Sequence, residues 1–161
     1  LAGPYAQHAI RRITGASDST TYPLIHQSIY SVHQRVAVSF RQGRVLLAGD
    51  AAHVNNPLGG FGLNSGIHDA ISLGHALAQV VKGEAGDEAL DRYNRQRQQA
   101  NVTYVQELSV RNKKNLEEKD PALRAQRMQE LRAVCADPVK AREYLLNSSM
   151  INSIHRAQSV A

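Results

Sequence analysis

The residues best suited to ligand chemistry lie between positions 43 and 77, where the sequence reads GRVLLAGDAAHVNNPLGGFGLNSGIHDAISLGHAL. Asp50 follows a short apolar run, at the position where open α/β sheets bind ligands. Its carboxylate can accept hydrogen bonds from the hydroxyl groups of a sugar or polyol. A loop rich in glycine follows, with Gly59, Gly60 and Gly62 in four positions. Glycines adopt backbone conformations closed to other residues and let a flat ligand approach the main chain. These residues predict a site where the backbone meets a cofactor.

The elements on either side must position this turn and loop. The continuous apolar run Val45–Ala48 is too short for a helix and predicts a strand buried on both faces, which Gly49 ends. After the loop, apolar residues recur with helical spacing from Leu63 to Lys82. The face that we expect to be buried consists of Leu63, Ile67, Ala70, Ile71, Gly74, Leu77, Ala78 and Val81.

The start of this helix is a second candidate for ligand binding. Unpaired N–H groups and the positive end of the helix dipole would lie at Gly62, Leu63 and Asn64, directly after the glycine loop. Such a helix end favours an anion or a developing negative charge. Gly66, Ala70, Gly74 and Ala78 form a ridge of small residues four apart, which would let the helix pack closely.

The order of these motifs resembles the second FAD motif of the flavoprotein aromatic monooxygenases of the para-hydroxybenzoate hydroxylase class. The resemblance is carried by GDAAH at 49–53, Pro57, Gly59, Gly62-Leu63-Asn64 and Asp69-Ala70, and it covers about residues 22 to 100. The resemblance implies that Asp50 binds the ribityl chain of FAD and that the backbone of Gly49 to Ala51 approaches the pyrophosphate. It also implies that the loop from Pro57 through Gly59 and Gly60 to Gly62 lines the reaction side of the isoalloxazine ring. Leu63 and Asn64 would offer N–H groups to its N1/O2 edge.

The class implies an oxidoreductase that uses FAD, NAD(P)H and O2 to hydroxylate an aromatic or similar small substrate. The flavin carries that chemistry, so we expect no catalytic side chain and no metal ligand in this chain. A relative with the same flavin half-site but another reaction, of the halogenase or isoprenoid reductase type, stays open. So does a folded interaction module that binds no flavin.

The sequence begins without Met and has no Gly-x-Gly-x-x-Gly fingerprint before the second motif. In the resembled class that fingerprint holds the ADP half of FAD. We therefore expect a C-terminal piece, inactive alone, whose partner is the N-terminal FAD-binding part of the same protein. The oligomeric state stays open. The expected fold class is α/β, or α+β by content: a fragment of an FAD/NAD(P)-binding fold.

Three regions are expected along the 161 residues. Residues 1–44 would be the end of a substrate-domain sheet with lead-in strands, including a short helix near Ala9 and a strand pair within 22–40. Residues 45–82 would hold the second FAD motif. Residues 83–161 would be helical, with one helix from Glu88 to about Leu116 that Asp87 caps. The apolar stripe of this helix would consist of Leu90, Tyr93, Ala100, Tyr104, Val105 and Leu108. Two more helices would start at Asp120-Pro121 and Asp137-Pro138, where a capping carboxylate precedes a proline. Their apolar stripes would be Leu123, Met128, Leu131 and Cys135 in the first and Ala141, Tyr144 and Leu145 in the second.

Composition excludes several function classes. One cysteine, Cys135, and seven histidines without cysteine partners give no zinc spacing and favour a reducing, cytoplasmic location. No apolar run is long enough to span a membrane. The net charge of +5 is spread among acidic residues and lacks interleaved aromatics, so we expect no nucleic-acid partner.

Five further side chains invite a functional reading. For His53 we expect packing or a local hydrogen bond rather than catalysis. His68 and His75 lie seven apart on the polar side of the helix, a spacing that does not pair metal ligands on one turn, so we expect both to be solvated. For the arginines Arg35 and Arg44, contact with a flavin phosphate and contact with surface acids are equally open.

Overall fold

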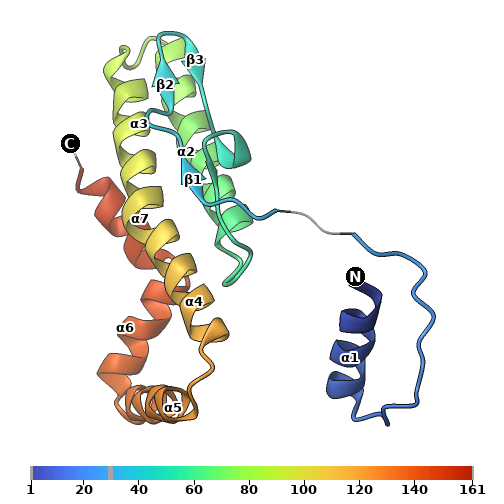
Figure 1. Cartoon of the computed structure of the whole chain (residues 1–161). Helices are drawn as coiled ribbons and strands as arrows, with labels where there is room; N and C mark the ends of the chain where they lie inside the picture. Colours follow the sequence, from blue (N-terminus) through green and yellow to red (C-terminus); the bar gives the residue numbers. More distant parts are fainter. Residues whose placement is uncertain (1, 29–30, 161) are drawn as a thin grey trace. The chain divides into compact units, whose positions relative to one another are not determined.

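The computed structural model describes residues 2–28 and 31–160 and divides the chain into two compact units, Leu1–Ser31 and Val32–Ala161. The chain is mostly helical with a few short strands, as the expected α+β content predicts (Figure 1). No helix within the described ranges is both long and apolar enough to cross a membrane.

The first unit contains helix α1, Ala2–Thr14, which confirms the short helix expected there. The chain then runs back without regular structure. Gln7 fixes this return, because its side-chain amide donates to the Tyr22 carbonyl at 2.7 Å and accepts from the Tyr22 N–H at 3.0 Å. The strand pair expected within 22–40 is wrong for residues 22–28, which form no strand, and residues 29–30 lie outside the described ranges.

Two small antiparallel ladders open the second unit. Strand β1, Arg35–Val36, pairs with β4, His53–Val54, and strand β2, Arg41–Gln42, pairs with β3, Val45–Leu46. The expected strand over Val45–Ala48 is therefore shorter than predicted. It is not buried on both faces either, since Val45 is 64 % exposed and β2 is the only strand that pairs with β3 in the described part of the chain.

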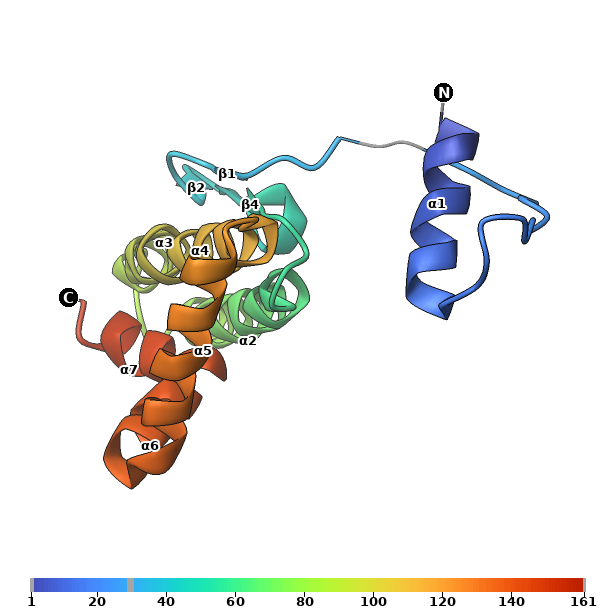
Figure 2. The same cartoon turned by 60° about the horizontal axis from the view of Figure 1, so that its bottom comes forward.

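Helix α2, Phe61–Val81, packs side by side with α3, Glu88–Ala100 (Figures 1 and 2). A π-helical segment, Asn101–Gln106, and helix α4, Glu107–Glu117, continue α3 without a break. The long helix expected from Glu88 to about Leu116 is thus confirmed. Its predicted apolar stripe is also buried: Leu90, Tyr93, Ala100, Tyr104, Val105 and Leu108 are each at most 9 % exposed.

The predicted buried face of α2 is wrong. Five members of that face are exposed by 38 to 84 %: Leu63, Ile67, Ile71, Leu77 and Val81. The helix instead buries Phe61, Ser65, Asp69 and Ala76, and it packs on α3, on the π-helical segment and on the Gly49–Ala51 turn. Periodicity finds the apolar side of a helix, but here the buried side is the one that carries the charged residue Asp69, which pairs with Arg97 of α3. Of the small-residue ridge, Gly66 makes the close approach, whereas Ala70, Gly74 and Ala78 are exposed.

Helices α5, Pro121–Ala136, and α6, Pro138–Ser148, begin at the expected Asp-Pro pairs. Asp120 accepts from the N–H of Ala122 at 2.8 Å, and Asp137 accepts from the N–H of Val139 at 2.9 Å. Their predicted apolar stripes are not buried, because α5 and α6 extend away from the α2–α3 pair (Figure 2). Helix α7, Ile151–Gln158, returns to pack on α3 and buries Ser153 and Ala157.

The expected cap at Asp87 is also wrong. Asp87 lies at the N-cap of α3 with a helical φ of −61° and makes no side-chain cap. Its carboxylate pairs instead with the Arg41 guanidinium at 2.6 Å. The side chain of Glu88 instead accepts from the backbone N–H of Gly86, just before the helix, at 2.8 Å.

Candidate functional site

The Gly49-Asp50-Ala51 turn is a single 3-10 turn at the end of the β3 segment, and it packs on α2. Gly49 has a φ of +60°, a conformation that favours glycine. A Cβ atom placed on Gly66 would lie 3.3 Å from the Gly49 Cα, so glycine on both sides allows this close approach. The turn therefore lies against α2 at Gly66, about five residues after the helix start, or about 7.5 Å along its axis.

A buried carboxylate holds the turn in place. Asp69, on α2, is fully buried and accepts from the backbone N–H of Gly49 at 3.1 Å. The same oxygen, Oδ2, lies 2.7 Å from His53 Nε2, and Oδ1 accepts from Arg97 Nε at 2.7 Å. Asp69 thus connects the turn, strand β4 and helix α3 through one side chain.

Burial of Asp69 acts to raise the pKa of its carboxyl group. The hydrogen bond from His53, the charge and hydrogen bond of Arg97 and the Gly49 N–H outweigh that effect and lower the pKa below its usual value of 3.8. Asp69 is therefore ionised at neutral pH, and the His53 Nε2 atom is the donor toward it. The buried charge has a full set of partners, as buried charges require.

Arg97 extends this cluster along α3. Its Nη2 atom donates to Ser65 Oγ at 3.2 Å, and Ser65 Oγ donates to Asn101 Oδ1 at 2.8 Å. Asn101 Nδ2 in turn donates to the carbonyl of Arg97 at 3.0 Å. A chain of polar contacts therefore fills the space between α2 and α3 where apolar packing was expected.

His53 is a buried packing residue, as expected. Its ring stacks on Phe40 with the centroids 6.2 Å apart, and its Nε2 atom is bound by Asp69. Its Nδ1 atom is buried without a hydrogen-bond partner in the described ranges. Of the other histidines, His75 is exposed and His68 is half-buried, and burial lowers the pKa of His68. Arg35 and Arg44 are both exposed.

The glycine loop needs glycine at two of its three positions. Gly59 has a φ of +108° and Gly60 a φ of +67°, and Gly60 is the N-cap of α2. The expectation that Gly62 also needs this freedom is wrong, because Gly62 lies inside the first turn of α2 with an ordinary helical conformation. Its position beside Asn55 still leaves little room, since a Cβ there would meet Asn55 Oδ1 at 3.2 Å.

The predicted binding residues form a surface rather than a closed cavity. Asp50, Ala51, Pro57, Gly59, Gly60, Leu63 and Asn64 are exposed, and Gly49 and Gly62 are half-buried. The Asp50 carboxylate has no hydrogen-bond or ion-pair partner in the part of the chain that the structure describes. No side chain in the described part of the chain caps the first N–H groups of α2. The structure brings all nine residues onto one end and one flank of a single helix.

The buried cluster is the part of the site that sequence reasoning missed. Arg97 occupies a position of the α3 stripe, four residues after Tyr93 and three before Ala100, where only apolar residues were counted. An arginine at a core position requires a buried acid. Asp69, already part of the motif, was the natural candidate. No group of three or more metal-ligating side chains occurs in the described part of the chain.

Comparison with known proteins places the chain in a family. The family model described as "FAD binding domain" matches residues 4–107. The para-nitrophenol 4-monooxygenase of Pseudomonas sp. (strain WBC-3) is 37 % identical over 142 residues, which is 88 % of this chain and 35 % of that protein. A 3-(3-hydroxy-phenyl)propionate/3-hydroxycinnamic acid hydroxylase of Mycolicibacterium smegmatis (strain ATCC 700084 / mc(2)155) is 54 % identical over 74 residues, 46 % of this chain and 13 % of that protein.

A solved structure gives the same assignment. The p-nitrophenol 4-monooxygenase PnpA of Pseudomonas putida DLL-E4 matches with a TM-score of 0.70 and 39 % identity, over 76 % of this chain and 30 % of that one. The chain belongs to the FAD binding domain family, and the resemblance seen in its motifs is confirmed. It spans about a third of the length of the para-nitrophenol 4-monooxygenase that it matches.

The residues present fit the FAD that this family binds. The free carboxylate of Asp50 offers an acceptor for polyol hydroxyls, and the uncapped start of α2 offers donors to a negatively charged group. Because residues 59 and 60 are glycines, no side chain covers the loop surface at these two positions. The buried Asp69 cluster holds the turn without using any of these exposed groups.

Proposed function

We propose that this chain is part of a flavin-dependent aromatic monooxygenase and supplies the second half of its FAD site. The observation that carries the proposal is the placement of the Asp50 turn and the loop-to-helix start on one helix, with their binding groups free. The relatives named as a nitrophenol monooxygenase and a hydroxyphenylpropionate hydroxylase support an aromatic substrate. The chain would work in the cytoplasm.

In this proposal each part of the site has one task. The Asp50 carboxylate binds ribityl hydroxyls, and the backbone of Gly49 to Ala51 faces the pyrophosphate. The loop from Pro57 to Gly62 lies along the flavin ring. The N–H groups of Leu63 and Asn64 bind the N1/O2 edge. Bound FAD supplies the redox chemistry, taking two electrons from NAD(P)H and delivering them to O2.

The chain's own residues then bind and orient the cofactor and exclude water from it. One oxygen atom enters the aromatic ring as a hydroxyl group and the other leaves as water, so NAD(P)H, O2 and a proton balance the reaction. The helix dipole at Gly60 stabilises negative charge at the ring edge, an effect of about 0.3 to 1 kcal/mol at an exposed helix end. We propose residues 1–44, 45–82 and 83–161 as the lead-in, motif and helical regions of this part.

The exposed apolar side of α2 supports the proposal that another part of a larger protein covers this helix. We propose that the N-terminal part, which holds the ADP half of FAD, covers Leu63, Ile67, Ile71 and Val81. Apolar side chains in a row along one helix are otherwise unfavourable in water. The chain alone would then bind FAD weakly and lack activity.

The test uses the complete protein that contains this chain, purified and examined for bound flavin. NAD(P)H consumption should depend on an added phenol, and the product should carry one labelled oxygen atom when the reaction runs under ¹⁸O2. Reduction of the substrate or incorporation of halide would assign the site to another flavin reaction. A complete protein without bound or bindable FAD would overturn the proposal.

A further inference from the structure

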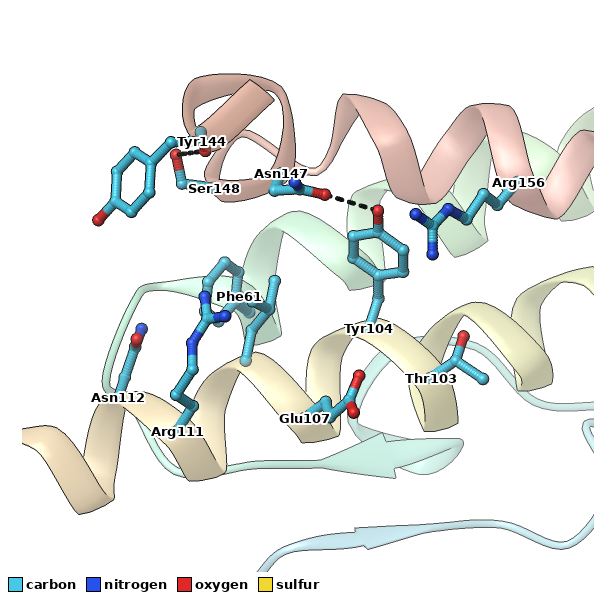
Figure 3. Close-up of a pocket in the computed structure, with 11 residues that line it drawn as sticks. Phe61, Thr103, Tyr104, Glu107, Arg111, Asn112, Tyr144, Asn147, Ser148 and Arg156 are labelled. Atoms are coloured by element: carbon cyan, nitrogen blue, oxygen red, sulfur yellow. Dashed lines mark hydrogen bonds between the residues drawn. The ribbon is translucent and has the colours of Figure 1, made fainter. Parts of the chain in front are cut away.

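A second candidate site lies behind the glycine loop, on the side of the C-terminal helices (Figure 3). It is a cavity of about 270 Å³ bounded by the α4 side of the long helix, by α6 and α7, and by the first residue of α2. None of the nine residues assigned to FAD lines it. This volume is close to the lower end of the range for ligand pockets, so it suits a single-ring molecule.

The charge of the cavity is the first indication of its ligand. Arg111 on α4 and Arg156 on α7 both line it, and neither makes an ion pair within the described ranges. Both of these arginines are exposed, whereas the buried Arg97 and the half-buried Arg41 are paired with carboxylates. Glu107 is the one carboxylate in the lining, which leaves a net charge of +1. A guanidinium group without a carboxylate partner is a site for the carboxylate of a ligand.

Aromatic rings form the walls between these charges. Phe61 and Tyr144 line the cavity with Tyr104, whose hydroxyl donates to Asn147 Oδ1 at 2.7 Å. The Arg156 guanidinium lies over the Tyr104 ring, 5.3 Å from its centroid (Figure 3). Rings of this kind pack against a flat apolar ligand in stacked or edge-to-face arrangements.

The backbone beside the cavity gives an independent indication that this is a functional site. Tyr104 and Thr103 reach the cavity from the π-helical segment Asn101–Gln106, where the long helix departs from regular α geometry. Such segments are rare and occur frequently at functional sites. The segment sets the register of the residues that face the cavity from this helix.

We propose that this cavity binds a small aromatic carboxylate, at a site separate from the FAD surface. Two lining residues connect it to the glycine loop. Asn112 Nδ2 donates to the carbonyl of Leu58 at 3.4 Å, and a Cβ on Gly59 would come within 2.7 Å of that same nitrogen. A ligand that displaces Phe61 or Asn112 would therefore act on the loop from behind.

The probe is benzoate, titrated into the 161-residue chain by NMR and calorimetry, with benzamide and acetate as matched controls. Benzamide keeps the ring without the charge, and acetate keeps the charge without the ring. We expect benzoate to bind at least about tenfold more tightly than either control. Benzamide loses the charge-assisted hydrogen bond, and acetate loses the ring contacts. Equal affinity for the three molecules, or no binding of benzoate, would overturn the proposal.

Substitutions of lining residues test whether benzoate binds in this cavity. Arg111→Gln and Arg156→Gln should each weaken benzoate binding about tenfold. Arg142→Gln, on the exposed side of α6, should leave it unchanged. Arg111 is exposed and makes no hydrogen bond or ion pair in the described part of the chain, so its variant is informative even if Arg156→Gln disturbs the packing over Tyr104. Benzoate binding that is the same in Arg111→Gln and Arg142→Gln would show that the ligand lies elsewhere.

Discussion

The backbone N–H of Gly49 donates a hydrogen bond to the Oδ2 atom of Asp69, 3.1 Å away, although twenty residues separate the two in the chain. The acceptor is buried and charged, and the donor belongs to the turn that carries Asp50. A buried acid, Asp69, and an exposed acid, Asp50, therefore lie at the same turn but have different roles. Asp69 fixes the backbone, and Asp50 is left free for a ligand.

Replacing Asp69 with Ala should destabilise the chain strongly. The Arg97 guanidinium would remain buried without its carboxylate, and breaking a buried pair in this way costs about 3 to 5 kcal/mol. Urea unfolding followed by circular dichroism measures the loss. Asp50→Ala is the matched control, since that side chain is exposed, and it should change the free energy of unfolding by less than about 0.5 kcal/mol. Equal effects of the two substitutions would contradict the assigned roles.

The contribution of Asp69 should also depend on pH in a defined direction. Its pKa in the folded chain is below the usual 3.8, so its stabilisation is fully present above about pH 4 and is lost as the pH falls through the folded value. The difference in unfolding free energy between the natural chain and Asp69→Asn should therefore narrow below pH 3.8. A difference that stays constant from pH 7 to pH 2 would show that the charge of Asp69 is not what stabilises the fold.

Asp50→Ala tests the ligand side of the turn in the complete protein. Loss of the acceptor for a ribityl hydroxyl should lower FAD occupancy after dialysis, while the melting temperature of the apoprotein stays the same. Flavin absorbance and thermal unfolding measure the two quantities separately. Full flavin occupancy in the variant would remove Asp50 from the site.

The two glycines before α2 should respond differently to the same substitution. Gly60→Ala places a methyl group in open space at a φ of +67°, with an expected cost of about 1 to 2 kcal/mol. Gly59→Ala adds a clash with the Phe61 ring at a φ of +108° and should cost more. Thermal unfolding of both variants shows which substitution destabilises the chain more. A smaller loss for Gly59→Ala would mean that the loop rearranges easily.

Tyr93 connects α3 to the segment that leads into the Asp50 turn. Its hydroxyl donates to the carbonyl of Leu47 at 2.6 Å, and its burial raises the pKa of the phenol, so it stays a donor at alkaline pH. Tyr93→Phe should lower the free energy of unfolding by about 0.5 to 1.5 kcal/mol. Tyr144→Phe, which removes an exposed hydroxyl, should have no measurable effect in the same urea titration.

The sequence predicts the elements of this fold well where a local chemical signal marks them. The Asp-Pro pairs locate the starts of α5 and α6, because a carboxylate cap and a proline act within one turn of the helix. The stripe from Leu90 to Leu108 locates the long helix, because every third or fourth residue meets the core. The order and spacing of the motif residues also indicate the family, which the family model matching residues 4–107 confirms.

The sequence predicts poorly which surfaces meet. On α2 the apolar stripe is evident, but periodicity does not say whether anything covers it, and here the opposite side is buried. The nine binding residues were placed by motif, and their roles stay predictions. Arg97 and Asn101 were missed because their burial depends on Ser65 and Asp69, which lie about thirty residues earlier.

The exposed apolar side of α2 also governs how the chain behaves in concentrated solution. At low ionic strength the net charge of +5 keeps molecules apart. Added salt shortens the range of that repulsion to about 8 Å at 0.15 M, while the attraction between uncovered apolar stripes remains. Self-association of the isolated chain should therefore increase with salt, so that dilute buffers favour monomers and physiological ionic strength favours aggregates.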